Sequence, residues 1–100
     1  MVTKKAGRTH SDTAIHPGKV LAEELAKRAM TQRELSRRLG RPERVVSEIV
    51  NGKRGVSIET ALGLEAVLGT SADFWLGLQM TYDLALARRR RPSRGRAKPG

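Results

Sequence analysis

Basic side chains with polar neighbours are concentrated between residues 31 and 54. This stretch carries seven lysines and arginines against three glutamates. The following residues, 55–87, carry four acidic side chains and no basic one. A small domain with one positive and one negative end is suited to bind a polyanion on one side and a different partner on the other. The chemistry that these residues predict is the recognition of a nucleic acid.

Residue types needed for catalysis or metal binding are scarce. The 100 residues include no cysteine and two histidines, His10 and His16, which excludes disulfides, thiolate ligands and a cysteine nucleophile. His16 has no nucleophile beside it, and we interpret it as the flank of a helix rather than as a catalytic base. The sequence also lacks a glycine-rich phosphate loop. We therefore predict a protein that is not an enzyme and that uses no metal and no cofactor.

Most of the net charge of +10 lies at the C-terminal end. Residues 88–100 hold seven basic and no acidic side chains, whereas residues 16–87 hold ten basic and nine acidic ones. We expect residues 1–14 to be a flexible arm and residues 91–100 a disordered basic tail. The basic run could continue the last helix or touch nucleic acid, and both interpretations stay open. No segment is typical of a membrane span or a secretory signal, so we predict a cytoplasmic protein.

Residues 15–90 between these ends have the pattern of five short helices, which predicts a compact all-α domain. Residues suited to begin helices are Pro17, Thr31, Pro42, Ser57 and Ser71, and Thr31 forms a capping box with Glu34. Residues suited to end them are Gly40, Asn51-Gly52 and Gly69. The expected core consists of Val20, Leu21, Leu25, Ala29, Leu35, Leu39, Val46, Ile49, Val50, Ile58, Ala61, Leu62 and Leu68.

The fifth helix, from about Ala72 towards Arg90, is apolar on more than one side. Its aromatic side chains are most simply explained as part of the core. Its apolar surface is nevertheless broader than one core contact needs, and exposed apolar area is typical of a partner surface. We therefore predict a homodimer interface on this helix, formed by Trp75, Leu78 and Tyr82.

Two short helices within residues 31–51 are separated by a tight turn at Gly40-Arg41-Pro42. This is the spacing of a DNA-binding helix-turn-helix. The N-terminus of the first helix, at Thr31 and Gln32, is suited to bind a phosphate through backbone N–H groups and the helix dipole. The second helix would enter the major groove, held on the domain by its apolar face. Its opposite face, free to touch bases, carries Glu43, Arg44, Val45, Ser47 and Glu48.

The run TQRELSRRLG, followed by VSEIVNGKRG, resembles the phage-repressor-type, Xre-like helix-turn-helix. A longer stretch, roughly residues 15–88, resembles the HigA-type antitoxins of bacterial toxin–antitoxin modules. Its most specific pieces are His16-Pro17-Gly18, SEIVNGKRG, and LGTSADFWLGLQ followed by YDLA. The resemblance implies a phage-repressor-like fold and an antidote that neutralises a HigB-type ribonuclease toxin. It also implies a dimer that represses its own promoter by binding a double-stranded DNA operator.

The resemblance further implies roles for single residues. The groove-facing positions would be Glu43, Arg44, Ser47 and Glu48, and the phosphate contacts would be Thr31, Gln32, Arg41, Asn51, Lys53 and Arg54. Arg41 stands where an apolar residue is usual, which is why we expect it at the DNA backbone. Arg44 could instead form a solvated ion pair with Glu48, four residues further along the helix.

Two other functions stay open. A free-standing Xre-like transcriptional regulator without a toxin partner would share the fold and the DNA-binding mode. A small basic, toxin-like reading frame directly upstream would favour the antitoxin instead. An RNA-binding or nucleoid-type protein, driven by the basic tail, would keep its affinity after loss of the helix-turn-helix side chains.

Overall fold

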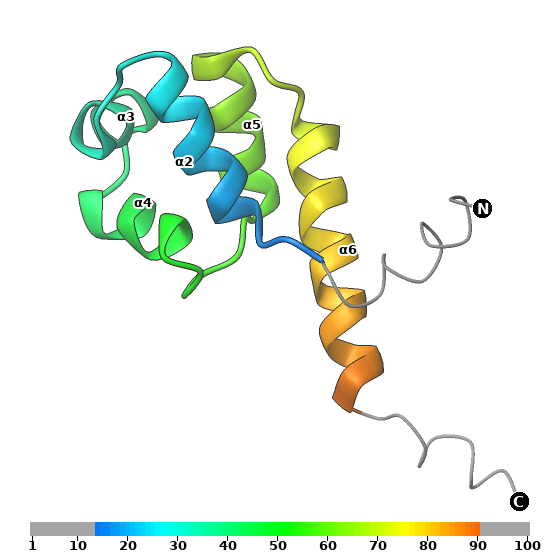
Figure 1. Ribbon diagram of the computed structural model, residues 1–100. Coiled ribbons are helices and arrows are strands. Elements are labelled where there is room, and N and C mark those ends of the chain that lie inside the picture. Colours follow the sequence, from blue (N-terminus) through cyan, green and yellow to red (C-terminus); the bar gives the residue numbers. More distant parts are fainter. Residues whose placement is uncertain (1–13, 91–100) are drawn as a thin grey trace, which may run out of the picture.

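The computed structural model describes residues 14–90, which form five helices and no strand. The predicted arm, apart from residue 14, and the predicted basic tail lie outside the described residues. The helices are α2 (Pro17–Lys27), α3 (Gln32–Leu39), α4 (Glu43–Val50), α5 (Ile58–Leu68) and α6 (Ala72–Arg90). Figure 1 shows α3 and α4 at one end of the bundle, α6 at the other, and α2 and α5 between them. The second half of α6 projects beyond the other helices (Figure 1).

Hydroxyl groups begin three of the helices, as the sequence predicts. Thr31 Oγ1 accepts the Glu34 N–H at 3.0 Å, and Ser57 Oγ accepts the Thr60 N–H at 3.1 Å. Ser71 Oγ accepts the Phe74 N–H at 3.1 Å. Each bond satisfies a backbone donor that has no partner within its helix. The starts of these three helices are therefore set by local side chains. Pro42, which the sequence predicts to begin the next helix, directly precedes α4 as its N-cap residue.

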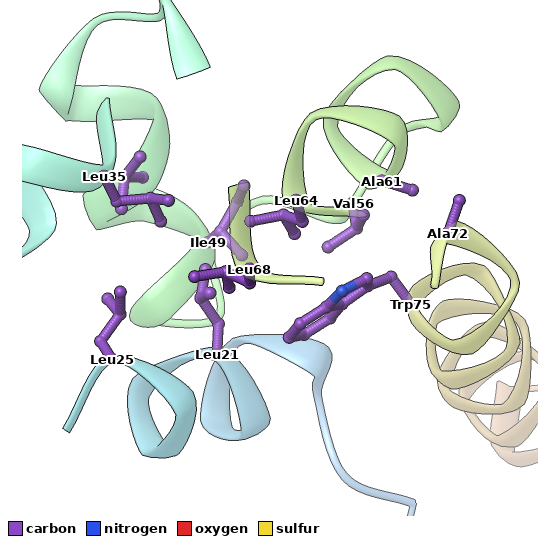
Figure 2. Packing of buried hydrophobic residues seen from close by; sticks show 11 residues of the cluster. Leu21, Leu25, Leu35, Ile49, Val56, Ala61, Leu64, Leu68, Ala72 and Trp75 are labelled. Carbon is purple, nitrogen blue, oxygen red and sulfur yellow. The ribbon is translucent and has the colours of Figure 1, made fainter. Parts of the chain in front are cut away.

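The core gathers one apolar side of each helix around the indole of Trp75. Trp75, Leu35, Val46, Ala61 and Leu64 have an exposed fraction of 0%. Figure 2 shows the Trp75 ring directed from α6 into a cluster formed by leucines of the other helices and by Val56 of the loop between α4 and α5. Burial of large apolar side chains supplies most of the stability of so small a domain. The remaining buried apolar members of the cluster are Leu21, Leu25, Ile49, Val56, Leu68 and Ala72.

Three residues expected in the core are exposed instead. Ile58 and Leu62 have exposed fractions of 67% and 54%, whereas the unpredicted Leu64 is buried. Helix α5 is apolar on several sides, so its packing against α3 and α6 selects the buried side. Ala29 follows α2 rather than belonging to it, and its positive φ of 52° turns the chain toward α3.

None of the helices in the described part of the chain is long and apolar enough to span a membrane.

Candidate nucleic-acid interface

Helices α3 and α4 form a helix-turn-helix at one end of the bundle (Figure 1). Gly40 ends α3 in the left-handed conformation, with a φ of 72°, which a side chain would disfavour. The turn is closed by the Arg41 N–H, which donates to the Ser36 carbonyl at 3.0 Å. Leu35 of α3 and Val46 of α4 are fully buried and hold the two helices against the core. The turn and this packing together fix the angle at which α4 projects.

The N-terminus of α3 is accessible for an anion. Thr31 is exposed and Gln32 is partly exposed. Thr31 satisfies the Glu34 N–H, and the first N–H groups of the helix point outward with the positive end of the helix dipole. Both residues thus lie where the sequence predicts a phosphate contact.

The outer side of α4 presents the predicted groove-facing residues. Glu43 and Arg44 are exposed, and the Arg44 side chain has an exposed fraction of 76%. Ser47 and Glu48 are partly exposed. Val45 differs from the prediction, because it is half-buried and packs against the hydrophobic core. We therefore remove Val45 from the residues that could touch bases.

Glu48 joins two arginines on this surface. Its Oε2 accepts from Arg44 Nε at 3.3 Å, and its Oε1 accepts from Arg54 Nε at 2.9 Å. Arg54 Nη2 lies 2.7 Å from the same Oε1 in an ion pair. The hydrogen bonds from Arg54 and then Arg44 hold the pKa of the Glu48 carboxyl below its ordinary value. Glu48 is consequently a carboxylate at neutral pH, and the ion pair that the sequence offered as an alternative for Arg44 is formed.

The segment after α4 carries three residues that the sequence predicts to contact the DNA backbone. Asn51, Lys53 and Arg54 are all exposed. The Asn51 side-chain amide donates to Ser47 Oγ at 3.4 Å, and the Lys53 N–H donates to the Glu48 carbonyl at 2.8 Å. These bonds keep the segment beside the outer surface of α4.

Arg41 takes part in an ion pair within the protein. Its Nη2 lies 2.7 Å from Glu59 Oε1, in the first turn of α5. The pair links the turn of the helix-turn-helix to the next helix. A phosphate contact by Arg41 would therefore have to compete with Glu59. The sequence alone did not predict this ion pair, because the two residues are 18 positions apart.

Gln79 is a positioning residue that the sequence analysis missed. Its Oε1 accepts the N–H of the buried Val56 at 2.7 Å, and its Nε2 donates to Asp83 Oδ1 at 2.9 Å. Gln79 thereby connects α6 to the loop that contains Val56, which follows the residues predicted to contact DNA phosphates. Because the two residues are 23 positions apart in the sequence, no local pattern could reveal the bond.

The predicted dimer residues lie mostly inside the protomer. Trp75 has no exposed surface, so it cannot contact a partner and the prediction for this residue is corrected. Leu78 is half-buried and packs against the core. Tyr82 is half-buried, with its ring 4.8 Å from that of His16 in an edge-to-face arrangement. The exposed apolar side chains of α6 are instead Phe74, Met80 and Leu84.

Among residues 14–90, no group of three or more His, Asp or Glu side chains is placed to hold a metal ion.

An exposed, cationic α3–turn–α4 unit on an all-α core defines the class of DNA-binding helix-turn-helix proteins. The chain belongs to the helix-turn-helix family, whose match covers residues 21–75. Its fold is the all-α, phage-repressor-like one that the sequence predicts.

Solved structures similar to this chain include HigA antitoxins. An addiction module antidote protein of the HigA family from Coxiella burnetii is 37% identical, with a TM-score of 0.79 over 85% of this chain and 94% of that one. Pseudomonas aeruginosa antitoxin HigA, solved with the higBA promoter, is 33% identical, with a TM-score of 0.82 over 86% and 95%. Virulence-associated protein I of Dichelobacter nodosus is 39% identical over 74% of this chain and 69% of its own length. These relatives are described as antidote, antitoxin and virulence-associated proteins, in agreement with the prediction that the chain is not an enzyme.

Proposed function

We propose that this protein is an antitoxin that binds its own operator as a dimer and neutralises a cognate HigB-type ribonuclease toxin. The observation that carries the proposal is the extent of the structural similarity. The antitoxin structures match 85–86% of the chain, so the likeness includes helices outside the helix-turn-helix. One of these relatives was solved with its promoter DNA.

In the proposed complex, α4 enters the major groove. The exposed Glu43 and Arg44 and the partly exposed Ser47 would face base edges, with Glu48 beside them. The N-terminus of α3 at Thr31 and Gln32 would bind one phosphate, and Asn51, Lys53 and Arg54 would follow the backbone on the other side of α4. This placement is supported by the exposure of these residues and by the accessible, positive end of the α3 dipole.

Arg44 and Gln32 separate base recognition from backbone contact. We expect Arg44→Ala to weaken operator binding by about 1–3 kcal/mol and to relax sequence preference at one position in each half-site. Gln32→Ala should weaken binding to the operator and to random DNA alike, because phosphates carry no sequence information. Fluorescence anisotropy with promoter and shuffled duplexes measures both effects. Unchanged operator affinity of Arg44→Ala would show that α4 is not in the groove.

The toxin partner is tested by co-expression with the adjacent reading frame. We expect the product of that frame to arrest growth when it is expressed alone. Co-expression of this protein should restore growth, and the two proteins should co-purify. A free-standing regulator is the second candidate, favoured by the 32% identity to the E. coli protein described as an uncharacterized HTH-type transcriptional regulator. That candidate predicts promoter binding without growth rescue or co-purification.

A further inference from the structure

One carboxylate holds both arginines that flank the groove-facing surface. Arg44 lies on the outer side of α4, and Arg54 lies in the segment that follows α4. Glu48 uses its two oxygens separately: Oε2 accepts from Arg44 at 3.3 Å, and Oε1 accepts from Arg54 Nε at 2.9 Å and lies 2.7 Å from Arg54 Nη2. The three side chains therefore form a bridge across the surface proposed to meet DNA, which we call the Glu48 bridge.

The N–H groups engaged in this bridge are those that DNA would use. An arginine recognises guanine or phosphate by presenting its guanidinium N–H groups in a planar fork. In the Glu48 bridge, the Nε–H groups of Arg54 and Arg44 already donate to a carboxylate, and Arg54 Nη2 is ion-paired with the same group. DNA that takes these N–H groups must replace Glu48 as their acceptor, while the negative charge of Glu48 repels nearby phosphates.

We infer that Glu48 is a specificity-determining residue that restrains Arg44 and Arg54 until the operator offers better acceptors. A random duplex supplies phosphates but no base acceptors in register with Arg44, so it compensates poorly for breaking the bridge and for the repulsion. The operator adds base acceptors in register with Arg44. Glu48 should thus weaken non-specific binding more than operator binding. This inference rests on the proposed DNA-binding function and assigns Glu48 a role other than direct base contact.

The test compares Glu48→Gln with Glu65→Gln. Both substitutions remove one negative charge from an exposed or partly exposed glutamate, but Glu65 lies on α5 and makes none of the ion pairs found within residues 14–90. We expect Glu48→Gln to bind a random duplex about three- to tenfold more tightly at low salt, because two surface pairs and one repulsive charge are lost. The ratio of operator to random affinity should fall by a similar factor. Glu65→Gln should change both affinities less than about twofold, because Glu65 pairs with neither arginine and its exposed charge is screened.

Salt titrations report whether the arginines are released. The slope of log K against log salt for random DNA should steepen by about one to two units in Glu48→Gln, at roughly 0.9 per phosphate neutralised. In an Arg54→Ala background the same substitution should raise the affinity for random DNA by a smaller factor, because one arginine remains to be freed. Circular dichroism melts of each variant confirm that the helices are retained.

Two results would overturn the inference. If Glu48→Gln weakens operator binding while random binding is unchanged, Glu48 reads a base directly. If Glu48→Gln and Glu65→Gln have equal effects, total charge alone is responsible. The random-duplex measurements do not depend on knowing the operator. A wild-type protein with no preference for its promoter would therefore refute the proposed function, while a release of affinity in Glu48→Gln could still be measured.

Discussion

His16 illustrates how a side chain suited to catalysis serves the fold instead. Its Nδ1 accepts the Gly18 N–H at 2.8 Å and so caps the N-terminus of α2, while its ring packs against Tyr82 of α6. Accepting this bond requires the neutral imidazole. Burial lowers the pKa of His16, and the nearby Asp83 carboxylate offsets part of that effect. The sequence interpretation of His16 as a helix flank agrees with this position.

Stability should therefore depend on the protonation of His16. Because the folded pKa is below the unfolded value of about 6.5, the unfolded chain binds the proton first. The contribution of His16 to the free energy of unfolding is therefore fully present above pH 6.5. It is lost as the pH falls from there through the lowered pKa of the folded state. We expect the urea midpoint to fall between pH 7.5 and pH 5 in the wild type. His16→Asn retains a capping acceptor without titrating in this range, so its midpoint should change less. Equal pH dependence of the two proteins would contradict this role.

Gln79 is expected to stabilise the loop beside the DNA-binding surface. Gln79→Leu would leave the buried Val56 N–H without its acceptor, at a cost of about 1–3 kcal/mol in the free energy of unfolding. Gln79→Glu keeps an acceptor for Val56 but places a second carboxylate near Asp83. Its loss of stability should be intermediate and should diminish at low pH. Chemical denaturation of the three proteins measures these differences, and wild-type stability of Gln79→Leu would show that the loop finds another acceptor.

At the level of the elements, α2 and α4 approach each other more closely than side chains allow. A Cβ atom on Gly18 would lie 1.8 Å from the carbonyl oxygen of Ile49, the last fully buried residue of α4. This close approach explains why the second residue of α2 is a glycine. The three residues His16-Pro17-Gly18 at the start of the helix each have a separate role. The imidazole caps the helix, the proline suits its first turn, and the glycine admits the backbone of α4.

Gly18→Ala should therefore separate α2 from α4. We expect a loss on the order of 1–3 kcal/mol in the free energy of unfolding, because the backbone must shift to admit the methyl group. Gly77→Ala provides the matched comparison, since Gly77 lies within α6 with no heavy atom within 4 Å of the added Cβ. That substitution should stabilise α6 by about 0.5–1 kcal/mol. Thermal melts followed by circular dichroism measure both, and a stabilising Gly18→Ala would contradict the packing described here.

At the scale of the whole molecule, we propose that exposed apolar side chains of α6 form the surface of a dimer. Met80 and Leu84 are 60% and 44% exposed and are spaced four residues apart, so they share one side of the helix. The α3–α4 unit lies at the opposite end of the bundle (Figure 1). A pair of protomers joined through α6 could thus present two recognition helices to one duplex.

A Met80→Glu, Leu84→Glu double variant should be monomeric and folded, because neither side chain belongs to the core cluster. We expect the wild type to be a dimer that binds half-sites about 10 base pairs apart, and the variant to lose tight binding to the paired site. Sedimentation and circular dichroism of both proteins test this expectation. A wild-type protein that is monomeric at tens of micromolar, free and on its operator, would refute it.

Local chemistry in the sequence was sufficient to predict the helices and the helix-turn-helix. The caps at Thr31, Ser57 and Ser71 and the left-handed Gly40 and Gly69 act within a few residues of themselves, so their types and spacing are informative without the fold. The exposed positions of α4 also followed from its period, except for Val45.

Only the tertiary structure decided which apolar surfaces are buried and which polar groups meet. Helices α5 and α6 are apolar on several sides, so period alone could not place Leu64 and Trp75 inside or Ile58 and Leu62 outside. The partners of Arg41 and Gln79 lie 18 and 23 residues away in the sequence. Glu48 pairs with Arg54 as well as with Arg44 on its own helix. These choices depend on how whole helices pack, because contacts between distant residues exist only after the chain has folded.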